Sequence, residues 1–163
     1  MLNVIVIMGV AGSGKTTVGK LLAEKLDWQF ADADDFHPPA NVIKMSAGHA
    51  LSDQDRAPWL QTLRANIETW TSKNQSTVLA CSALKASYRE LLQVSNAVSV
   101  VYLKGDFSLF EKRLRGRQGH FMKTTMLESQ FQTLEEPEGS LTVDASENPE
   151  SIVKEIRAKL ELN

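Results

Sequence analysis

Short uninterrupted runs of apolar residues recur along this chain, and segments with helical spacing of apolar residues separate them. Five such runs predict buried strands, at residues 4–8, 29–33, 77–81, 98–103 and 141–143. Strands covered on both faces are apolar throughout, which is the pattern of a parallel sheet. The alternation of strands with helices therefore favours one α/β domain, residues 1–163, with helices on both faces of its sheet.

The segments between the strands carry recognisable helix signals. Apolar residues recur at helical spacing from Val18 to Leu26, which predicts a helix soon after the first strand. Residues that favour helix N-termini precede three later helices, namely Ser52, Asp106 and Asn148. The helical segments thus have defined starting points in the sequence.

Two longer stretches do not fit simple strand–helix alternation. Residues 35–75, between the second and third strands, predict an insertion with its own helix. Residues 114–136 fit neither a strand nor a strong core helix, and their polar composition with Gly116 and Gly119 is typical of a mobile flap.

Composition excludes several classes of protein. The 163 residues are enough for one hydrophobic core, and a single cysteine with three widely spaced histidines provides neither an internal disulfide nor a structural zinc site. A formal charge of −2 argues against nucleic-acid binding by bulk electrostatics. The first apolar run is too short for a membrane span and lacks the pattern of a signal peptide, so we expect a cytoplasmic protein without membrane or nucleic-acid partners.

The strongest chemical signal is a glycine-rich loop between the first strand and its helix. The loop comprises Gly9, Val10, Ala11, Gly12, Ser13, Gly14, Lys15 and Thr16. In this context its N–H groups are expected to bind the phosphates of ATP, with Lys15 on the β- and γ-phosphates and the Thr16 hydroxyl on Mg²⁺. Thr17 belongs to the same nucleotide site without being needed for the metal. The alternative is a glycine-rich turn before an ordinary helix.

Acidic residues follow the second strand. Asp32, Asp34 and Asp35 should therefore lie at the carboxyl edge of the sheet, where the phosphate loop also lies. An Asp-x-Asp pair in an extended segment points both acids the same way, so Asp32 can organise Mg²⁺ through water while Asp34 meets an acceptor hydroxyl. The alternative is a solvated loop that caps a helix.

Further blocks make the chain resemble the gluconokinase family. They are Gly9–Thr16, Asp32–Pro38, Asn41–Met45, Leu51–Leu60, Cys81–Lys85, Tyr88–Arg89, Tyr102–Gly105, Gly119–Met122 and Ser129–Phe131. The resemblance implies the three-layer P-loop kinase fold of shikimate and nucleoside-monophosphate kinases, with a five-stranded parallel sheet. It also implies a substrate-binding insertion, a lid and a homodimer. The reaction implied is transfer of the γ-phosphoryl of ATP to the 6-hydroxyl of D-gluconate.

A sugar acid needs a cation for its carboxylate and hydrogen-bonding groups for its hydroxyls. Arg56 is expected to bind the carboxylate because its planar guanidinium can bond both oxygens. The alternative is that Arg56 only pairs with Asp53 or Asp55 on the surface. His37 is expected either to line the sugar pocket or to be a hydrogen-bonded structural histidine.

Three polar residues follow the third strand and are candidates for the same crevice. Ser82 to Lys85 are expected to open a helix whose first N–H groups face the crevice. Lys85 and Arg89 would share one helix face, where they could hold hydroxyls or the transferred phosphoryl. A solvated helix edge is the alternative.

The flap is expected to contribute to transfer. Arg117 is predicted to stabilise the charge that spreads over the moving phosphoryl, whereas Arg113 is expected only to complement a helix dipole. Gln130 is assigned to the substrate by the family resemblance alone. Two other functions remain open from the sequence, a shikimate- or nucleotide-type kinase and a non-catalytic ATP-sensing module.

Overall fold

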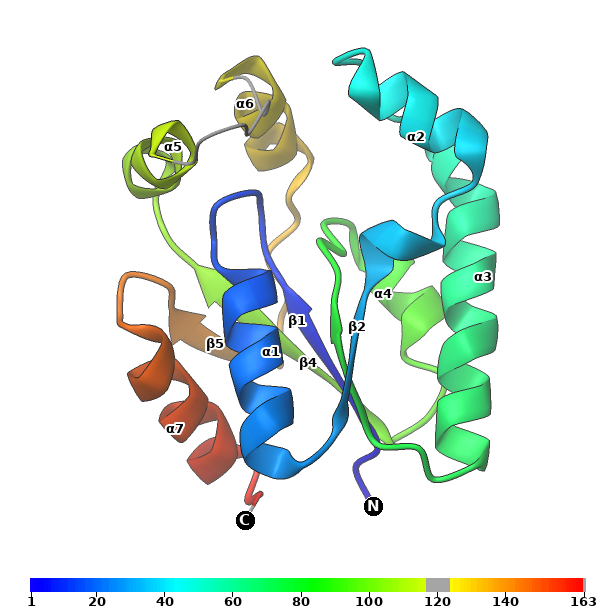
Figure 1. Ribbon diagram of the computed structural model, residues 1–163, viewed down its shortest axis with the longest axis vertical. Helices are drawn as coiled ribbons and strands as arrows, with labels where there is room; N and C mark the ends of the chain where they lie inside the picture. The colour runs from blue at the N-terminus through cyan, green and yellow to red at the C-terminus, as the bar shows by residue number, and fades with distance from the viewer. Residues whose placement is uncertain (117–123, 163) are drawn as a thin grey trace.

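Five parallel strands lie at the centre of the structure, a computed structural model that describes residues 1–116 and 124–162 (Figure 1). They are β1 (Val4–Met8), β2 (Gln29–Asp32), β3 (Thr77–Ala80), β4 (Val98–Lys104) and β5 (Leu141–Asp144). Their order is β2-β3-β1-β4-β5, and β1 pairs in parallel with both β3 and β4. The predicted five-stranded parallel sheet is therefore confirmed, with end residues that differ by one position at most.

Helices cover both faces of this sheet. They are α1 (Lys15–Leu26), the 3₁₀ helix η1 (Ala33–Phe36), α2 (Pro39–Ser46), α3 (Asp53–Ser72), α4 (Ala86–Leu92), α5 (Phe107–Arg115), α6 (Thr124–Thr133) and α7 (Pro149–Lys159). Side chains of β1 alternate between the two layers: Ile5 and Ile7 pack in the cluster with α1 and α7, and Val4 and Val6 in the cluster with α3 and α4. All four are fully buried, as a strand in the middle of three layers must be.

The helix starts predicted at Ser52, Asp106 and Asn148 are confirmed by their hydrogen bonds. The Ser52 hydroxyl accepts from the Asp55 N–H at 3.1 Å, and the Asp55 carboxylate accepts from the Ser52 N–H, which completes a capping box. The Asp106 and Asn148 side chains accept from N–H groups of α5 and α7, each at 2.8 to 2.9 Å. These caps satisfy donors that a helix cannot satisfy internally.

Two expectations about the longer stretches need correction. Residues 35–75 contain two α-helices, α2 and α3, rather than one. The stretch 114–136 contains α6, whose Leu127 is fully buried and belongs to the core cluster with α1 and α7. Phe131 of α6 also packs against this cluster, beside Phe107 and Phe110 of α5, so the helix is held by contacts with distant residues that the polar composition of the segment does not reveal. Among the described residues, no helix is both long and apolar enough to cross a membrane.

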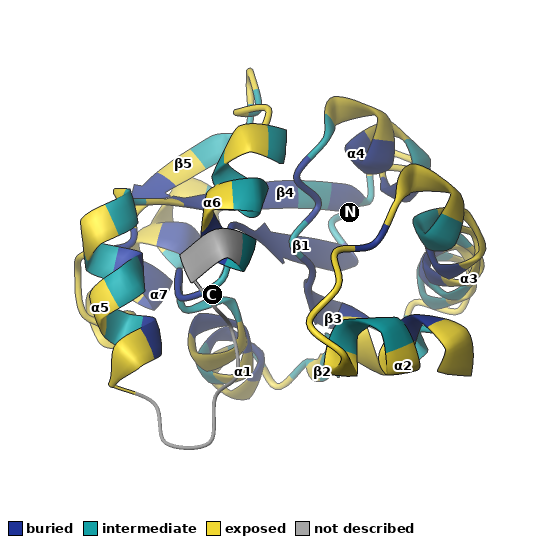
Figure 2. Ribbon diagram, turned by 90° about the horizontal axis from the view of Figure 1, so that it is seen from above, coloured by how far each residue is buried: buried dark blue, intermediate teal, exposed yellow. Residues whose placement is uncertain are grey.

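The carboxyl ends of the strands define one edge of the molecule. The loop after β1, η1 after β2 and residues 81–85 after β3 all emerge at this edge. Figure 2 looks onto it and shows α2 and α6 on opposite sides. In parallel α/β sheets this edge is where ligands bind.

Candidate active site

The loop after β1 has the backbone geometry of an anion cradle. Gly12 and Gly14 have φ angles of 82° and 99°, a region that side chains disfavour. A Cβ atom at Gly12 would also lie 2.9 Å from the carbonyl oxygen of Phe110 in α5. Because Gly14 at the N-cap has no side chain, the first N–H groups of α1 receive no side-chain cap and can bind an anion.

The carboxylate of Asp32 joins this loop to the acids after β2. The Thr16 hydroxyl donates to Asp32 Oδ2 at 3.4 Å, and Asp32 Oδ1 accepts from the Asp34 N–H at 2.9 Å. A hydroxyl beside one carboxylate fits Mg²⁺, which binds protein through few ligands and takes its others from phosphates and water. Among the described residues, no group of three His, Cys, Asp or Glu could hold a metal ion.

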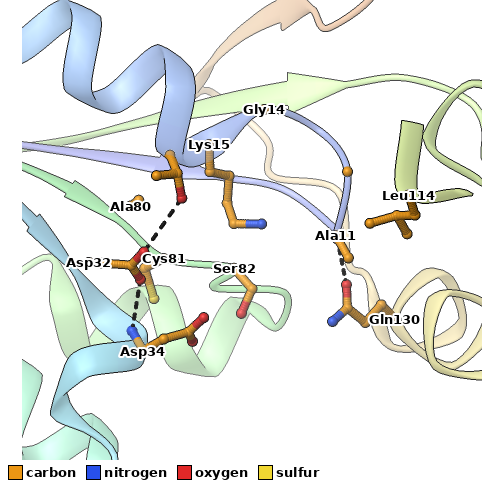
Figure 3. Close-up of a pocket in the computed structure, with 12 residues that line it drawn as sticks. Ala11, Gly14, Lys15, Asp32, Asp34, Ala80, Cys81, Ser82, Leu114 and Gln130 are labelled. Atoms are coloured by element: carbon orange, nitrogen blue, oxygen red, sulfur yellow. Dashed lines mark hydrogen bonds between the residues drawn. The ribbon is translucent and has the colours of Figure 1, made fainter. Parts of the chain in front are cut away.

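A cavity of about 190 Å³ lies between the loop and the acids (Figure 3). Its lining is Ala11, Gly12, Gly14, Lys15, Thr16, Asp32, Asp34, Ala80, Cys81, Ser82, Leu114 and Gln130. Figure 3 shows the Lys15 side chain reaching toward the space that Asp34 and Ser82 also border. The glycine loop and the acid pair therefore border a single cavity, as the sequence predicts, but Asp34 lies in η1 rather than in an extended segment, and Asp32 caps that helix.

The Asp34 carboxyl has a pKa raised above its usual range. Its side chain is 81% exposed, yet it stands in the mouth of a cleft, where the surrounding protein reduces hydration of its charged form. The neighbouring charges of Asp32 and Asp35 add to the increase, and Lys15 opposes it. A carboxylate with a raised pKa is a better proton acceptor than an ordinary aspartate.

A second, larger cavity of about 520 Å³ adjoins the first and shares Asp34, Ser82 and Gln130 with it. The rest of its described lining is His37, Met45, Ser46, Gly48, Ala50, Leu51, Arg56, Trp59, Leu84, Met126, Ser129 and Thr133. Most of these residues come from the insertion on one side and from α6 on the other, and Leu84 comes from the segment after β3. The mixture of one arginine, hydroxyls and apolar walls suits a small polyhydroxylated anion.

His37 and Arg56 both border this larger cavity. The His37 ring stacks on Trp59 with centroids 4.3 Å apart, and its Nδ1 lies 3.2 Å from the Asn41 amide nitrogen. His37 is thus a hydrogen-bonded histidine that also borders the larger cavity, and its contact with a sugar stays a prediction. Burial and the Arg56 charge lower its pKa, so it is neutral near pH 7.

The neighbours of Arg56 bear on both of its predicted roles. Asp55 is bound by Lys44, at 2.6 Å, and by the N-terminus of α3. The Arg56 Nη1 donates to the Tyr88 hydroxyl at 3.1 Å and lies 3.9 Å from Asp53. Arg56 therefore borders the larger cavity and also lies at the outer limit of ion-pair distance from Asp53, so its role in substrate binding stays a prediction.

The segment after β3 differs from the prediction. Helix α4 begins at Ala86, because Ala83 has a φ angle of 46° and interrupts any helix from Ser82. Ser82 lines both cavities, as expected. Lys85 instead pairs with Asp53 at 2.8 and 2.9 Å, outside the described lining of either cavity. The predicted helix start at 82 is wrong.

Arg89 is not brought to the crevice. It is buried, with 6% exposure, and its guanidinium donates to the Ala83 carbonyl at 2.7 Å and the Glu135 carbonyl at 2.8 Å. The prediction that Arg89 holds substrate is therefore corrected: it ties the irregular loop after β3 to the segment after α6. The alternative, that Arg89 lies on a solvated helix edge, is also wrong because Arg89 is buried.

Replacing Arg89 with methionine is expected to lower the free energy of unfolding by about 2–4 kcal/mol, since two buried carbonyls lose a charged donor. Urea denaturation measures this. Glu90→Gln, at the exposed next position of α4, is the matched control and should change stability by less than about 0.5 kcal/mol. Equal stabilities of the Arg89 variant and the wild type would contradict this structural role.

Gln130 connects α6 to the phosphate loop. Its Oε1 accepts from the Ala11 N–H at 2.6 Å, so it lies where the two cavities meet. The predicted flap arginine, Arg117, lies outside the described residues. Gln130 remains a predicted substrate residue, now with a definite position beside the loop.

Arg113 is a residue whose position the sequence did not indicate. It does not merely complement a dipole: Nη1 donates to the Gly12 carbonyl at 3.2 Å, and Nη2 to the Ala145 carbonyl at 2.6 Å. With Val18 and Pro149, it borders a further cavity of about 240 Å³ on the other side of the glycine loop. The sequence offers one signal for this position: Arg113 lies next to the buried residues Phe110 and Leu114 of α5.

Cys81 is a buried core residue, as expected. It is 1% exposed at the end of β3, and burial raises the pKa of its thiol to about 12. The thiol is therefore protonated at neutral pH and unsuited to act as a nucleophile.

The parallel sheet, glycine loop and facing acids define a P-loop small-molecule kinase. The shikimate kinase family model matches residues 11–161. The thermoresistant gluconokinase of Escherichia coli (strain K12) is 44% identical over 156 residues, covering 93% of this chain and 89% of that protein. The chain belongs to the gluconokinase family, and it is an enzyme of the kinase class.

Solved structures agree with this assignment. A gluconokinase from Sinorhizobium meliloti 1021 matches with a TM-score of 0.87 and 41% identity, over 98% of this chain and 91% of that one. An unliganded sugar kinase from Janibacter sp. HTCC2649 matches with a TM-score of 0.92 and 36% identity, over 99% and 96%. The insertion and α6, which build the larger cavity, thus lie within the aligned length.

Proposed function

We propose that this protein transfers the γ-phosphoryl of MgATP to the 6-hydroxyl of D-gluconate, giving 6-phospho-D-gluconate and ADP. The observation that carries the proposal is the junction of two cavities at Asp34, one bordered by Lys15 and the glycine loop and the other by Arg56. Gluconokinase relatives at 42–44% identity support the choice of substrate.

Each part of the site has a role in this reaction. The glycine loop and Lys15 bind the β- and γ-phosphates, and Thr16, with Asp32 through water, would hold Mg²⁺, which would offset phosphate charge. The cavity beside Arg113 and Pro149 receives the nucleoside. Arg56 binds the gluconate carboxylate and so directs the far end of the substrate toward Asp34.

The transfer step then needs little more from the protein than position and charge. The 6-hydroxyl oxygen bonds to the γ-phosphorus while the bond to the β–γ bridging oxygen breaks, and ADP leaves. Asp34 accepts the hydroxyl proton, for which its raised pKa suits it. Lys15 stabilises the negative charge on the phosphates throughout.

We further propose residues 35–75 as the substrate-binding insertion and 114–136 as the lid, of which 117–123 lie outside the described residues. A homodimer is part of this proposal, and light scattering after size-exclusion chromatography tests it. A measured mass equal to that of the monomer, at the protein concentrations used in the assay, would contradict the homodimer.

An ADP-release assay with gluconate, shikimate, AMP or water as acceptor tests the activity. We expect turnover with gluconate and little with the others. Turnover with shikimate or AMP but not with gluconate would favour a different kinase on the same fold. ATP binding without any acceptor turnover would favour an ATP-sensing module.

Replacing Arg56 with lysine is expected to raise the gluconate KM by about tenfold or more, because an ammonium cannot bond both carboxylate oxygens. The ATP KM should change little, since Arg56 borders the larger cavity and not the phosphate cavity. Steady-state kinetics with each substrate varied in turn measures both constants. An effect on ATP alone would assign Arg56 to the nucleotide.

A further inference from the structure

Two cations lie close to the single carboxylate of Asp53, in the first turn of α3. Lys85 Nζ donates to both Asp53 oxygens, at 2.8 and 2.9 Å. Arg56 Nη1 stays at 3.9 Å from Asp53 Oδ1, and the Tyr88 hydroxyl lies between them, accepting from Arg56 and donating to Asp53. Lys85 is therefore the closer partner of Asp53, and Arg56 lies at the limit of ion-pair distance.

We propose that Lys85 is a positioning residue for substrate binding: by pairing with Asp53 it keeps the Arg56 guanidinium available for the substrate carboxylate. This inference rests on the proposed function, in which Arg56 binds that carboxylate. Lys85 itself borders neither cavity in the described lining, whereas Arg56 borders the larger one. Lys85 thus acts through Asp53 and not through the substrate.

The charges around Asp53 explain why this pairing matters. Without Lys85, the nearest cation to Asp53 among those described is Arg56, three residues along the same helix. A guanidinium bonds a carboxylate in two-pronged fashion, so Arg56 would turn toward Asp53, and the substrate would have to displace an internal competitor. The lowered pKa of Asp53, due first to the Lys85 hydrogen bond, agrees with Lys85 as its main partner. Asp53 is 65% exposed, so water weakens the competition without removing it.

The test is a double-mutant cycle on Lys85 and Asp53, with gluconate and ATP kinetics measured for each variant. Lys85→Met is expected to raise the gluconate KM by about two- to fivefold, while kcat and the ATP KM stay close to their wild-type values. Adding Asp53→Asn should return the gluconate KM to near the wild-type value, because the competing charge is gone. A KM that stays high in the double variant would mean that Lys85 touches the substrate, which overturns the inference, as would an unchanged KM in Lys85→Met.

Arg64→Met is the matched control for a purely structural effect. Arg64 also links α3 to α4, through the Leu91 carbonyl at 3.2 Å, and pairs with Glu68 at 3.0 Å. Its loss removes a positive charge and an interhelical contact away from both cavities, so the melting temperature should fall while the gluconate KM stays at the wild-type value. An equal KM rise in Arg64→Met would show that loosening α3 against α4 suffices, and would overturn the inference.

Wild-type turnover separates this test from the proposed function. If the wild type fails to phosphorylate gluconate, the proposed function falls and this inference with it. If the wild type is active but Asp53→Asn fails to rescue Lys85→Met, only the inference falls.

Discussion

Lys15→Ala is expected to lower kcat by about three orders of magnitude, since removal of a single group that stabilises transition-state charge has effects of this size. Lys15 stands at the first position of α1, and its Nζ donates to the Val10 carbonyl at 3.1 Å, which holds the ammonium within the glycine loop. Nothing in alanine replaces that charge beside the phosphates.

Single-turnover kinetics measures the loss, and circular dichroism checks that the fold is retained. Lys20→Ala is the matched control: Lys20 lies on the same helix, is exposed, and packs over the Phe30 ring at 5.8 Å. Its kcat should match the wild type. A Lys15→Ala variant that retained kcat within about tenfold of the wild type would contradict the phosphate site.

Asp34→Asn is expected to lower kcat by about 10²- to 10⁴-fold, because an amide of the same shape cannot accept the hydroxyl proton. The KM values for ATP and gluconate should change much less, since hydrogen bonding to the hydroxyl is partly kept. Asp35→Asn is the matched control, because Asp35 is exposed and stands outside the described lining of both cavities. A kcat equal to wild type in Asp34→Asn would remove the proton acceptor from the mechanism.

The pH dependence of kcat gives a second measurement on Asp34. The acceptor must be ionised, so activity falls as pH drops through its pKa. Because the pKa of Asp34 is raised, this acid limb should lie at higher pH than for an ordinary aspartate. In Asp34→Asn, the residual kcat should no longer fall at low pH. An acid limb that persists unchanged in this variant would show that another group is responsible for it.

Much of the fold could be predicted because its signals are local. Residues 4–8 are apolar without interruption and become the central strand β1, and Ser52 caps α3 through contacts within four residues. The glycine loop is equally local, since its shape follows from glycines that permit positive φ angles. These features depend on neighbours along the chain and so are visible in the sequence.

The errors occurred where distant segments decide the structure. Helix α6 is not predicted from the sequence because its apolar residues Leu127 and Phe131 pack in a core assembled from other elements. Lys85 and Arg89 look alike as basic residues on one helix, yet Lys85 pairs with Asp53 and Arg89 is buried against the Glu135 carbonyl. Partners 32 and 46 positions away cannot be read from spacing.

The sequence by itself determined the phosphate loop, the facing acids and the parallel sheet, since backbone geometry and apolar periodicity are written into adjacent residues. The tertiary structure decided which cations are available to a ligand: it packs Arg89 inside, binds Lys85 to Asp53 and leaves Arg56 at the wall of the larger cavity. The physical reason is that a charged side chain takes the nearest suitable partner in space, and folding alone establishes which partner that is.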